Sequence, residues 1–160
     1  MPSTLKTTPY IVSDMGDLLK SAYLRAKAVE YLQRWIGTPY IFGGDDFTAF
    51  DCSGLMVEVL QAVGVIPHKS DYTAAALYER FEGSAVDCGY AGCLVFWYSG
   101  GKINHVEMMV DDLHTVGASG GGSSTQTLAD AIAQNAFVKM RPLRYRGDAF
   151  RIIDPFKETS

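Results

Sequence analysis

The chain has 160 residues, of which 48% are hydrophobic and 20% charged, and its formal net charge is −4 at pH 7. This length suits one domain with a sizeable core, and the apolar content excludes intrinsic disorder. The acidic balance argues against sequence-independent binding of nucleic acid, which relies on cations that neutralise phosphates. No apolar run approaches the roughly 18 residues that a membrane-spanning helix needs. We therefore expect a single domain over residues 1–160, with no membrane span and no nucleic-acid partner.

The N-terminal segment, MPSTLKTTPY, lacks the apolar core of a Sec signal peptide. We expect residues 1–13 to form a loose N-terminal arm or an edge strand. From Ser13 to Ile36 the apolar residues recur at three- and four-residue steps, which is typical of an amphipathic helix. Gly37 and Pro39 are expected to end this helix.

The segment Thr38–Phe50 is rich in glycine and aspartate and is predicted to be a loop. A second helix is predicted from Cys52 to Val63, because its apolar residues form one stripe and Gly64 follows as a stop signal. A short third helix is predicted over Tyr72–Phe81.

Strand patterns dominate the rest of the chain. The run CLVFWY at Cys93–Tyr98 is apolar and aromatic throughout, which predicts a strand covered on both faces. Further strands are predicted over Val106–Val110, Leu113–Ala118, Phe137–Arg141 and Ala149–Ile153, with a weak helix at Leu128–Ala136. Helices thus precede an antiparallel sheet, and this order predicts an α+β fold.

Cys52 lies at the predicted start of the second helix, where backbone N–H groups and the helix dipole stabilise a thiolate. A cysteine there can act as a nucleophile when a base is close, although a buried structural cysteine is the plain alternative. His105 stands at the head of a predicted strand and suits the role of base, with a surface histidine as the plain alternative. A cysteine on an early helix followed by a histidine on a later strand is the chain order of papain-like enzymes.

Short motifs follow one another in a set order. They are Gly37-Thr38-Pro39-Tyr40, Gly43-Gly44, Asp51-Cys52-Ser53-Gly54, Gly64-Val65-Ile66-Pro67, the run Gly92–Trp97, and His105-Val106. Together they resemble the NlpC-type cell-wall cysteine peptidases over roughly residues 26–124. The resemblance implies a papain-like α+β fold, with N-terminal helices packed on a central antiparallel sheet.

The resemblance also implies hydrolysis of an amide bond in peptidoglycan stem peptides, commonly the bond between D-glutamate and the diamino acid. Cys52 is the implied nucleophile and His105 the implied general base. Tyr40 matches a tyrosine whose hydroxyl helps to stabilise the oxyanion, with a plain packing role as the alternative. Asp51 and Ser53 match positions that hold the free amine of the stem peptide, and Asp51 also suits a helix N-cap. No cofactor and no metal are expected.

Two positions depart from the family pattern. Cys93 stands where the family has aspartate, and it either pairs with Cys88 or stays a free thiol. The family's third polar residue, which orients the catalytic histidine, falls at Gly117. A backbone carbonyl near Gly117, an ordered water, or His114 brought round by a bulge are the possible substitutes, so His114 is a tentative third catalytic residue. Strand alternation points His114 to the other face and favours the carbonyl or the water.

Three functional classes remain open at this stage. The first is a peptidoglycan endopeptidase, and the second is an amidase that cuts between the sugar lactyl group and L-alanine. The third is a phage-tail or cell-wall-binding module with a decayed active site, which Gly117 mildly favours. Since no export signal is visible, we expect delivery to the cell wall by a phage particle, by lysis or by injection, with a tail or virion protein as an assembly partner.

Overall fold

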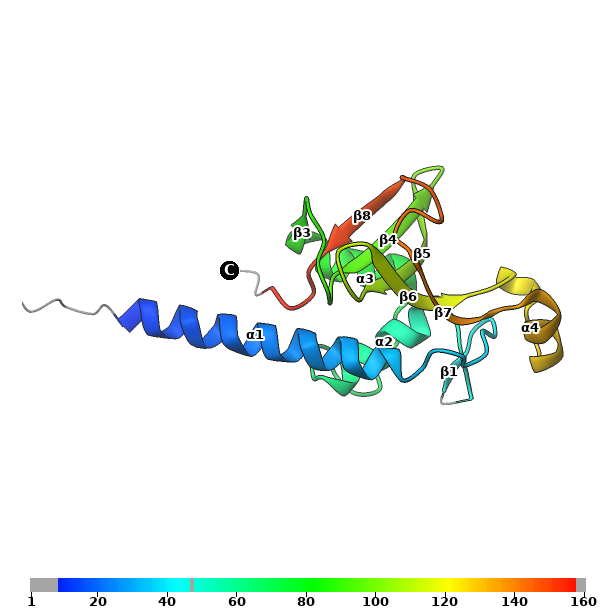
Figure 1. Ribbon diagram of the computed structural model, residues 1–160, viewed down its shortest axis with the longest axis horizontal. Coiled ribbons are helices and arrows are strands. Elements are labelled where there is room, and N and C mark those ends of the chain that lie inside the picture. Colours follow the sequence, from blue (N-terminus) through cyan, green and yellow to red (C-terminus); the bar gives the residue numbers. More distant parts are fainter. Residues whose placement is uncertain (1–8, 47, 158–160) are drawn as a thin grey trace, which may run out of the picture.

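The computed structural model describes residues 9–46 and 48–157 and has a central antiparallel sheet (Figure 1). Its strands are β3 (Ala85–Val86), β4 (Leu94–Ser99), β5 (Lys102–Met109), β6 (His114–Ser119), β7 (Phe137–Pro142) and β8 (Phe150–Ile153). They lie in the order β3-β8-β4-β5-β6-β7, and every neighbouring pair is antiparallel. The predicted α+β fold is confirmed.

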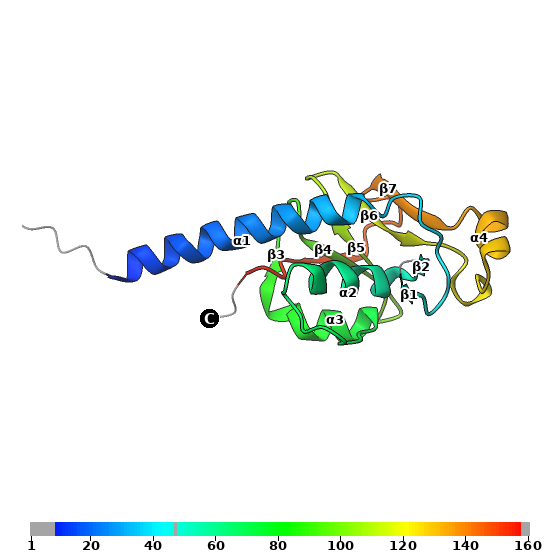
Figure 2. The same cartoon turned by 90° about the horizontal axis from the view of Figure 1, so that it is seen from below.

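The helices are α1 (Pro9–Gln33), α2 (Cys52–Ala62), α3 (Ala74–Phe81) and α4 (Leu128–Gln134). Short 3-10 turns lie at Glu82–Ser84 and Gly122–Ser124, and a small hairpin pairs β1 (Asp45–Asp46) with β2 (Ala49–Phe50). Figure 2 shows α2 and α3 together on one face of the sheet, with α1 running past them. No helix in the described part of the chain is both long enough and apolar enough to cross a membrane.

The first helix begins earlier than predicted. It starts at Pro9 rather than Ser13, so residues 9–13 are helical and not a loose arm, while residues 1–8 lie outside the described residues. Proline is favoured in the first turn of a helix, because its fixed φ suits the helix and its missing N–H would have no partner there. The N-terminal half of α1 projects from the body (Figure 1), and the side chains of Leu18 and Leu19 are exposed. Only the C-terminal half packs on the core, through Ala28 and Leu32.

The second helix follows its predicted stripe. Its buried residues include Leu55, Met56, Val59 and Leu60, all fully excluded from solvent. These side chains join the core between α1, α3 and the sheet. The helix therefore packs mainly on β5 and β6.

The apolar run at β4 is covered on both faces, as predicted. Leu94 and Phe96 belong to the core beneath the helices, whereas Cys93, Val95 and Trp97 form a second cluster on the opposite face. That second face is covered by residues from the segment after β7 and by β8, namely Leu143, Tyr145, Phe150 and Ile152. The C-terminal part of the chain is thus needed to complete the core.

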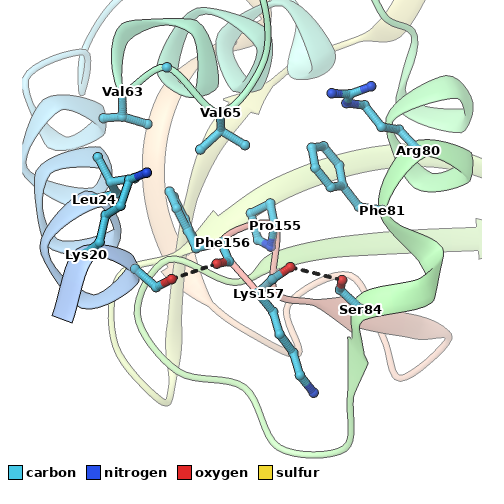
Figure 3. A pocket seen from close by; sticks show the side chains of 12 residues that line it. Lys20, Leu24, Val63, Val65, Arg80, Phe81, Ser84, Pro155, Phe156 and Lys157 are labelled. Carbon is cyan, nitrogen blue, oxygen red and sulfur yellow. Dashed lines mark hydrogen bonds between the residues drawn. The ribbon is translucent and has the colours of Figure 1, made fainter. Parts of the chain in front are cut away.

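The last described residues dock between the helices. Figure 3 shows a cavity of about 520 Å³ between α1, the end of α2 and the end of α3, with Pro155 and Phe156 along one side. The hydroxyl of Ser21 donates to the carbonyl of Phe156 at 3.0 Å, and that of Ser84 donates to the carbonyl of Lys157 at 3.5 Å. Val63 and Val65 line this cavity, so it lies at the end of α2 that is remote from Cys52.

A buried carboxylate ties α1 to the end of the chain. Asp154 is 2% exposed and accepts hydrogen bonds from the Arg25 guanidinium at 2.6 Å, from the Tyr90 hydroxyl at 2.7 Å and from the N–H of Phe156 at 2.9 Å. Because the Arg25 side chain is only 20% exposed, this ion pair is shielded from solvent on both sides.

We expect Asp154→Ala to lower the free energy of unfolding by about 2–3 kcal/mol, because it leaves the shielded Arg25 guanidinium without its counter-charge. Urea unfolding measures the change. Glu30→Ala is the control, since Glu30 forms exposed ion pairs with Lys27 and Arg34 that contribute little. An effect of Asp154→Ala no larger than that of Glu30→Ala would contradict this assignment.

Candidate active site

The first turn of α2 is held by Asp51. Its Oδ1 accepts the N–H of Gly54 at 2.7 Å and the hydroxyl of Ser53 at 3.4 Å, and its Oδ2 accepts the N–H of Gly43 at 3.1 Å. Burial raises the pKa of Asp51 above its ordinary value, and these donors oppose the rise. The N-cap role considered for Asp51 is confirmed, and the same carboxylate links the helix start to the preceding loop.

A close backbone approach explains the glycine two residues after the cysteine. A Cβ on Gly54 would lie 2.3 Å from the carbonyl oxygen of Gly44, so a side chain at this position would force the two segments apart. The same carbonyl of Gly44 accepts the N–H of Asp51 at 2.9 Å. The loop before α2 therefore lies directly on its first turn, and this contact fixes where Cys52 stands.

Cys52 faces the strand that carries His105. The backbone N–H of Val106, the residue after His105 in β5, lowers the pKa of the Cys52 thiol, so the thiol lies near this part of β5. Burial raises the pKa of Cys52 to about 11, although the backbone N–H groups of Val106 and Ser53 oppose the rise. The thiol is therefore protonated at neutral pH, whereas the helix start alone would predict a thiolate.

Tyr40 reaches the same place from the loop before α2. The residue is 7% exposed, and its backbone N–H donates to the carbonyl of Ala136 at 2.9 Å. The pKa of its phenol is raised to about 12, mainly by burial and in part by Cys52 and Asp51, because each of them would place a negative charge close to the phenolate. The structure thus brings Tyr40 and Cys52 together, as predicted.

His105 is buried at 5% exposure, with its ring beside that of Trp97. Its Nε2 lies 2.8 Å from Oε1 of Glu107. Burial lowers the pKa of His105 below its ordinary 6.5, and the neighbouring Glu107 opposes the fall. The imidazole is therefore neutral at pH 7, and Nδ1 is the ring nitrogen left for a partner other than Glu107.

Glu107 is a site residue that the sequence analysis missed. It is 1% exposed, and besides the His105 contact its Oε1 accepts the Tyr145 hydroxyl and its Oε2 accepts the Thr115 hydroxyl, each at 2.6 Å. Burial raises the pKa of Glu107, but these hydrogen bonds outweigh burial and hold the pKa below its ordinary value. A signal for it was present in the sequence, because alternate residues of a strand share a face and so place Glu107 beside His105.

Glu107 also fills the space at Gly117. The pairing of Met108 with Val116 places Gly117 directly opposite Glu107. A Cβ on Gly117 would lie 2.2 Å from Cγ and 2.7 Å from Cδ of Glu107. The expectation that a backbone carbonyl or a water holds His105 here is wrong, because the carboxylate of Glu107 occupies that place.

The structure does not bring His114 to His105. The Nδ1 of His114 lies 3.0 Å from both carboxylate oxygens of Asp111, and its side chain is 41% exposed. The N–H of Val110 donates to the carbonyl of His114, so His114 lies opposite a residue five positions beyond His105, or about 16 Å along the strand. No bulge carries it back, and the tentative assignment of His114 as the third residue is not supported by this geometry.

Arg146 is a second residue that the sequence analysis did not connect with the site. Its Nε donates to the Tyr145 hydroxyl and its terminal nitrogen to the Ser119 hydroxyl, both at 3.0 Å. Its positive charge lowers the pKa values of Cys52, Tyr40 and His105 alike. The exposed Arg146 guanidinium therefore lies close enough to this site to act electrostatically on all three side chains.

The arrangement brings a thiol at a helix start to the strand that carries a buried imidazole. Within residues 9–46 and 48–157, no group of three histidine, cysteine or acidic residues is placed to hold a metal ion. Cys88 is exposed and Cys93 is buried, and both are free thiols.

Comparison with solved structures gives the same fold. The NlpC/P60 domain of the peptidoglycan hydrolase SagA is 25% identical, over 80% of this chain and 97% of that one, with a TM-score of 0.58. The P60 domain of an antigen from M. avium subspecies paratuberculosis is 23% identical, over 86% and 98% of the two chains, with a TM-score of 0.63. RipB from Mycobacterium tuberculosis is 20% identical, over 96% and 93%, with a TM-score of 0.57.

Comparison of sequences identifies the family. Protein P54 of Enterococcus faecium is 35% identical over 88 residues, which are 51% of this chain but only 15% of that protein. The model of the NlpC/P60 family matches residues 37–142, a range that contains Tyr40, Cys52, His105 and Glu107. The chain belongs to the NlpC/P60 family.

Proposed function

We propose that this protein is a peptidoglycan hydrolase that cleaves stem peptides as a cysteine endopeptidase. The observation that carries the proposal is the placement of Cys52 at the start of α2, which packs on β5, the strand that holds the buried imidazole of His105 with its Nε2 at 2.8 Å from Glu107. Membership of the NlpC/P60 family and the likeness to the SagA domain support peptidoglycan as the substrate. The bond between D-glutamate and the diamino acid is the proposed target, on the resemblance of the motifs around Cys52.

The proposed reaction starts from a neutral pair. Nδ1 of His105 takes the thiol proton as the Cys52 sulfur attacks the carbonyl carbon of the scissile amide. The N–H of Cys52, which has no partner within the helix, and the hydroxyl of Tyr40 stabilise the oxyanion. His105 then passes its proton to the leaving amine as the C–N bond breaks and a thioester remains. The same imidazole then takes a proton from water as the water oxygen attacks the thioester carbonyl. The C–S bond breaks, the carboxylic acid is released, and His105 returns the proton to the Cys52 sulfur.

Acidic groups near the first turn of α2 suit a substrate ammonium. Asp51 keeps acceptor capacity beyond its backbone contacts, and the carboxylate of Asp71 acts on it electrostatically. A cavity of about 190 Å³ beside this turn is lined by Asp71 and Glu58, among others. Lys69 also lines this cavity, whereas Asp51 and Ser53 lie at the start of the helix beside it. We propose that Asp51 and Ser53 hold the free amine of the stem peptide at this helix start.

Two other functions were considered. An amidase that cuts between the lactyl group and L-alanine would use the same thiol and imidazole. A decayed, non-catalytic module was favoured mainly by Gly117, and that argument loses its force because Glu107 fills the space. Delivery to the wall by a phage particle, by lysis or by injection stays a prediction, as does a tail or virion partner.

We expect Cys52→Ala to abolish the release of fragments from purified sacculi, because the proposed chemistry has no other nucleophile. Mass spectrometry of the fragments identifies the new amine, which is that of the diamino acid for the endopeptidase and of L-alanine for the amidase. Cys88→Ala is the matched control, since Cys88 is exposed and lies outside the site, and it should keep full activity. Residual cleavage by a folded Cys52→Ala protein would refute the cysteine mechanism.

We expect Tyr40→Phe to lower kcat by about 10²–10³, the usual effect of removing one oxyanion donor, while the buried ring keeps its packing. Steady-state kinetics on a soluble stem peptide measures the effect. Tyr23→Phe on the projecting part of α1 is the control for loss of an exposed hydroxyl. An unchanged kcat in Tyr40→Phe would remove this hydroxyl from the mechanism.

A further inference from the structure

Three hydrogen bonds hold the carboxylate of Glu107 in the interior. Its hydrogen-bond donors come from three separate segments, namely His105 on β5, Thr115 on β6 and Tyr145 after β7. Tyr145 is in turn held by Arg146, which is anchored on Ser119. A buried carboxylate with these contacts has a single orientation, so the group that faces His105 is fixed in place.

Glu107 and Gly117 are complementary across two strands. Residue 117 lies opposite residue 107, and Cβ, Cγ and Cδ of Glu107 would all lie within 2.9 Å of a Cβ on residue 117. These atoms run from the first carbon of the side chain to its carboxyl carbon, and the side chain is 1% exposed with its carboxylate held by three donors. Glu107 can therefore reach His105 only because residue 117 carries no side chain.

We propose that Glu107 is the positioning residue of His105, and that the glycine at position 117 exists to admit it. The ionised carboxylate accepts hydrogen bonds only, so the contact at 2.8 Å requires the proton on Nε2 of His105. Nδ1 is then unprotonated and free to take a proton from the thiol. Glu107 thus sets both the tautomer and the plane of the ring.

The proposal predicts a defined pH effect. The described groups that act on His105 are Glu107, whose charge raises the pKa of the imidazole, and Arg146, whose charge lowers it. Replacing Glu107 by the neutral glutamine removes the negative charge that raises the pKa of His105, so this pKa falls. Activity requires a neutral imidazole, and the ascending limb of the pH profile therefore moves to lower pH in Glu107→Gln.

The first test is ¹⁵N NMR of the histidine rings, which does not depend on any activity. In the unmodified protein we expect the proton of His105 on Nε2 alone, while the exposed His68 and His114 serve as internal references. In Glu107→Ala we expect a mixture of the two tautomers. A folded Glu107→Ala protein whose His105 tautomer is unchanged would overturn the proposal.

The second test is kinetic and rests on the proposed hydrolysis. Glu107→Ala should lower kcat by about 10- to 100-fold with KM within about twofold, and Glu107→Gln should retain more activity with its pH limb displaced. His114→Ala is the rival variant, and a loss equal to that of Glu107→Ala would overturn the assignment to Glu107. If no variant and no unmodified protein cleaved stem peptides, the proposed function would fail while the NMR result still decided the role of Glu107.

A third test examines the complementarity itself. Gly117→Ala should lower the unfolding temperature by about 4 °C or more, because its Cβ collides with Glu107. In a Glu107→Gly background, the same substitution should lower it by less than about 1 °C. Equal losses in the two backgrounds would show that residues 107 and 117 do not compete for one space.

Discussion

The candidate active site depends on one buried charge, the carboxylate of Glu107. An ionised carboxylate excluded from water is unfavourable by several kcal/mol unless donors replace its hydration. Glu107 obtains those donors from β5, β6 and the segment after β7, so the charge is stable only when these segments adopt the observed register. The same segment after β7 covers the outer face of β4 through Leu143 and Tyr145. The same segment therefore completes the core and fixes the imidazole of His105 through Glu107.

The cysteine half of the site is built from backbone contacts instead. Asp51 caps α2, and the carbonyl of Gly44 lies against the turn at Gly54, so the start of the helix cannot slide. The backbone N–H of Val106 lowers the pKa of the Cys52 thiol, which therefore lies near β5. Both reacting side chains thus stand on regular elements, a helix start and a strand, which hold geometry more tightly than loops do.

Local patterns in the sequence predicted what depends on local interactions. The apolar stripe of α2 and the two-sided burial of β4 follow from the periodicity and composition of the sequence, and both are observed. The pairing of Cys52 with His105 follows from short motifs and stays a prediction. The start of α1 was placed at Ser13 because the polar residues before it hid the signal of Pro9. Glu107 was not singled out from the sequence, although a charge inside an apolar strand is itself informative. Tyr145 and Arg146 could not be predicted as neighbours of the site. Their contacts depend on how the segment after β7 folds back onto the sheet, and no periodicity of the sequence encodes that.

The opposition of residues 107 and 117 changes how such a sequence should be interpreted. If each position is judged separately, Gly117 stands where the family has the polar residue that orients the histidine. The chain would then be classified as an enzyme that has lost its activity. The carboxylate instead arises two residues from the histidine on the same strand, and the glycine is its steric counterpart. Chains that combine an acidic residue after the His-Val pair with a glycine ten positions later would form a distinct subgroup, recognisable by the joint substitution alone.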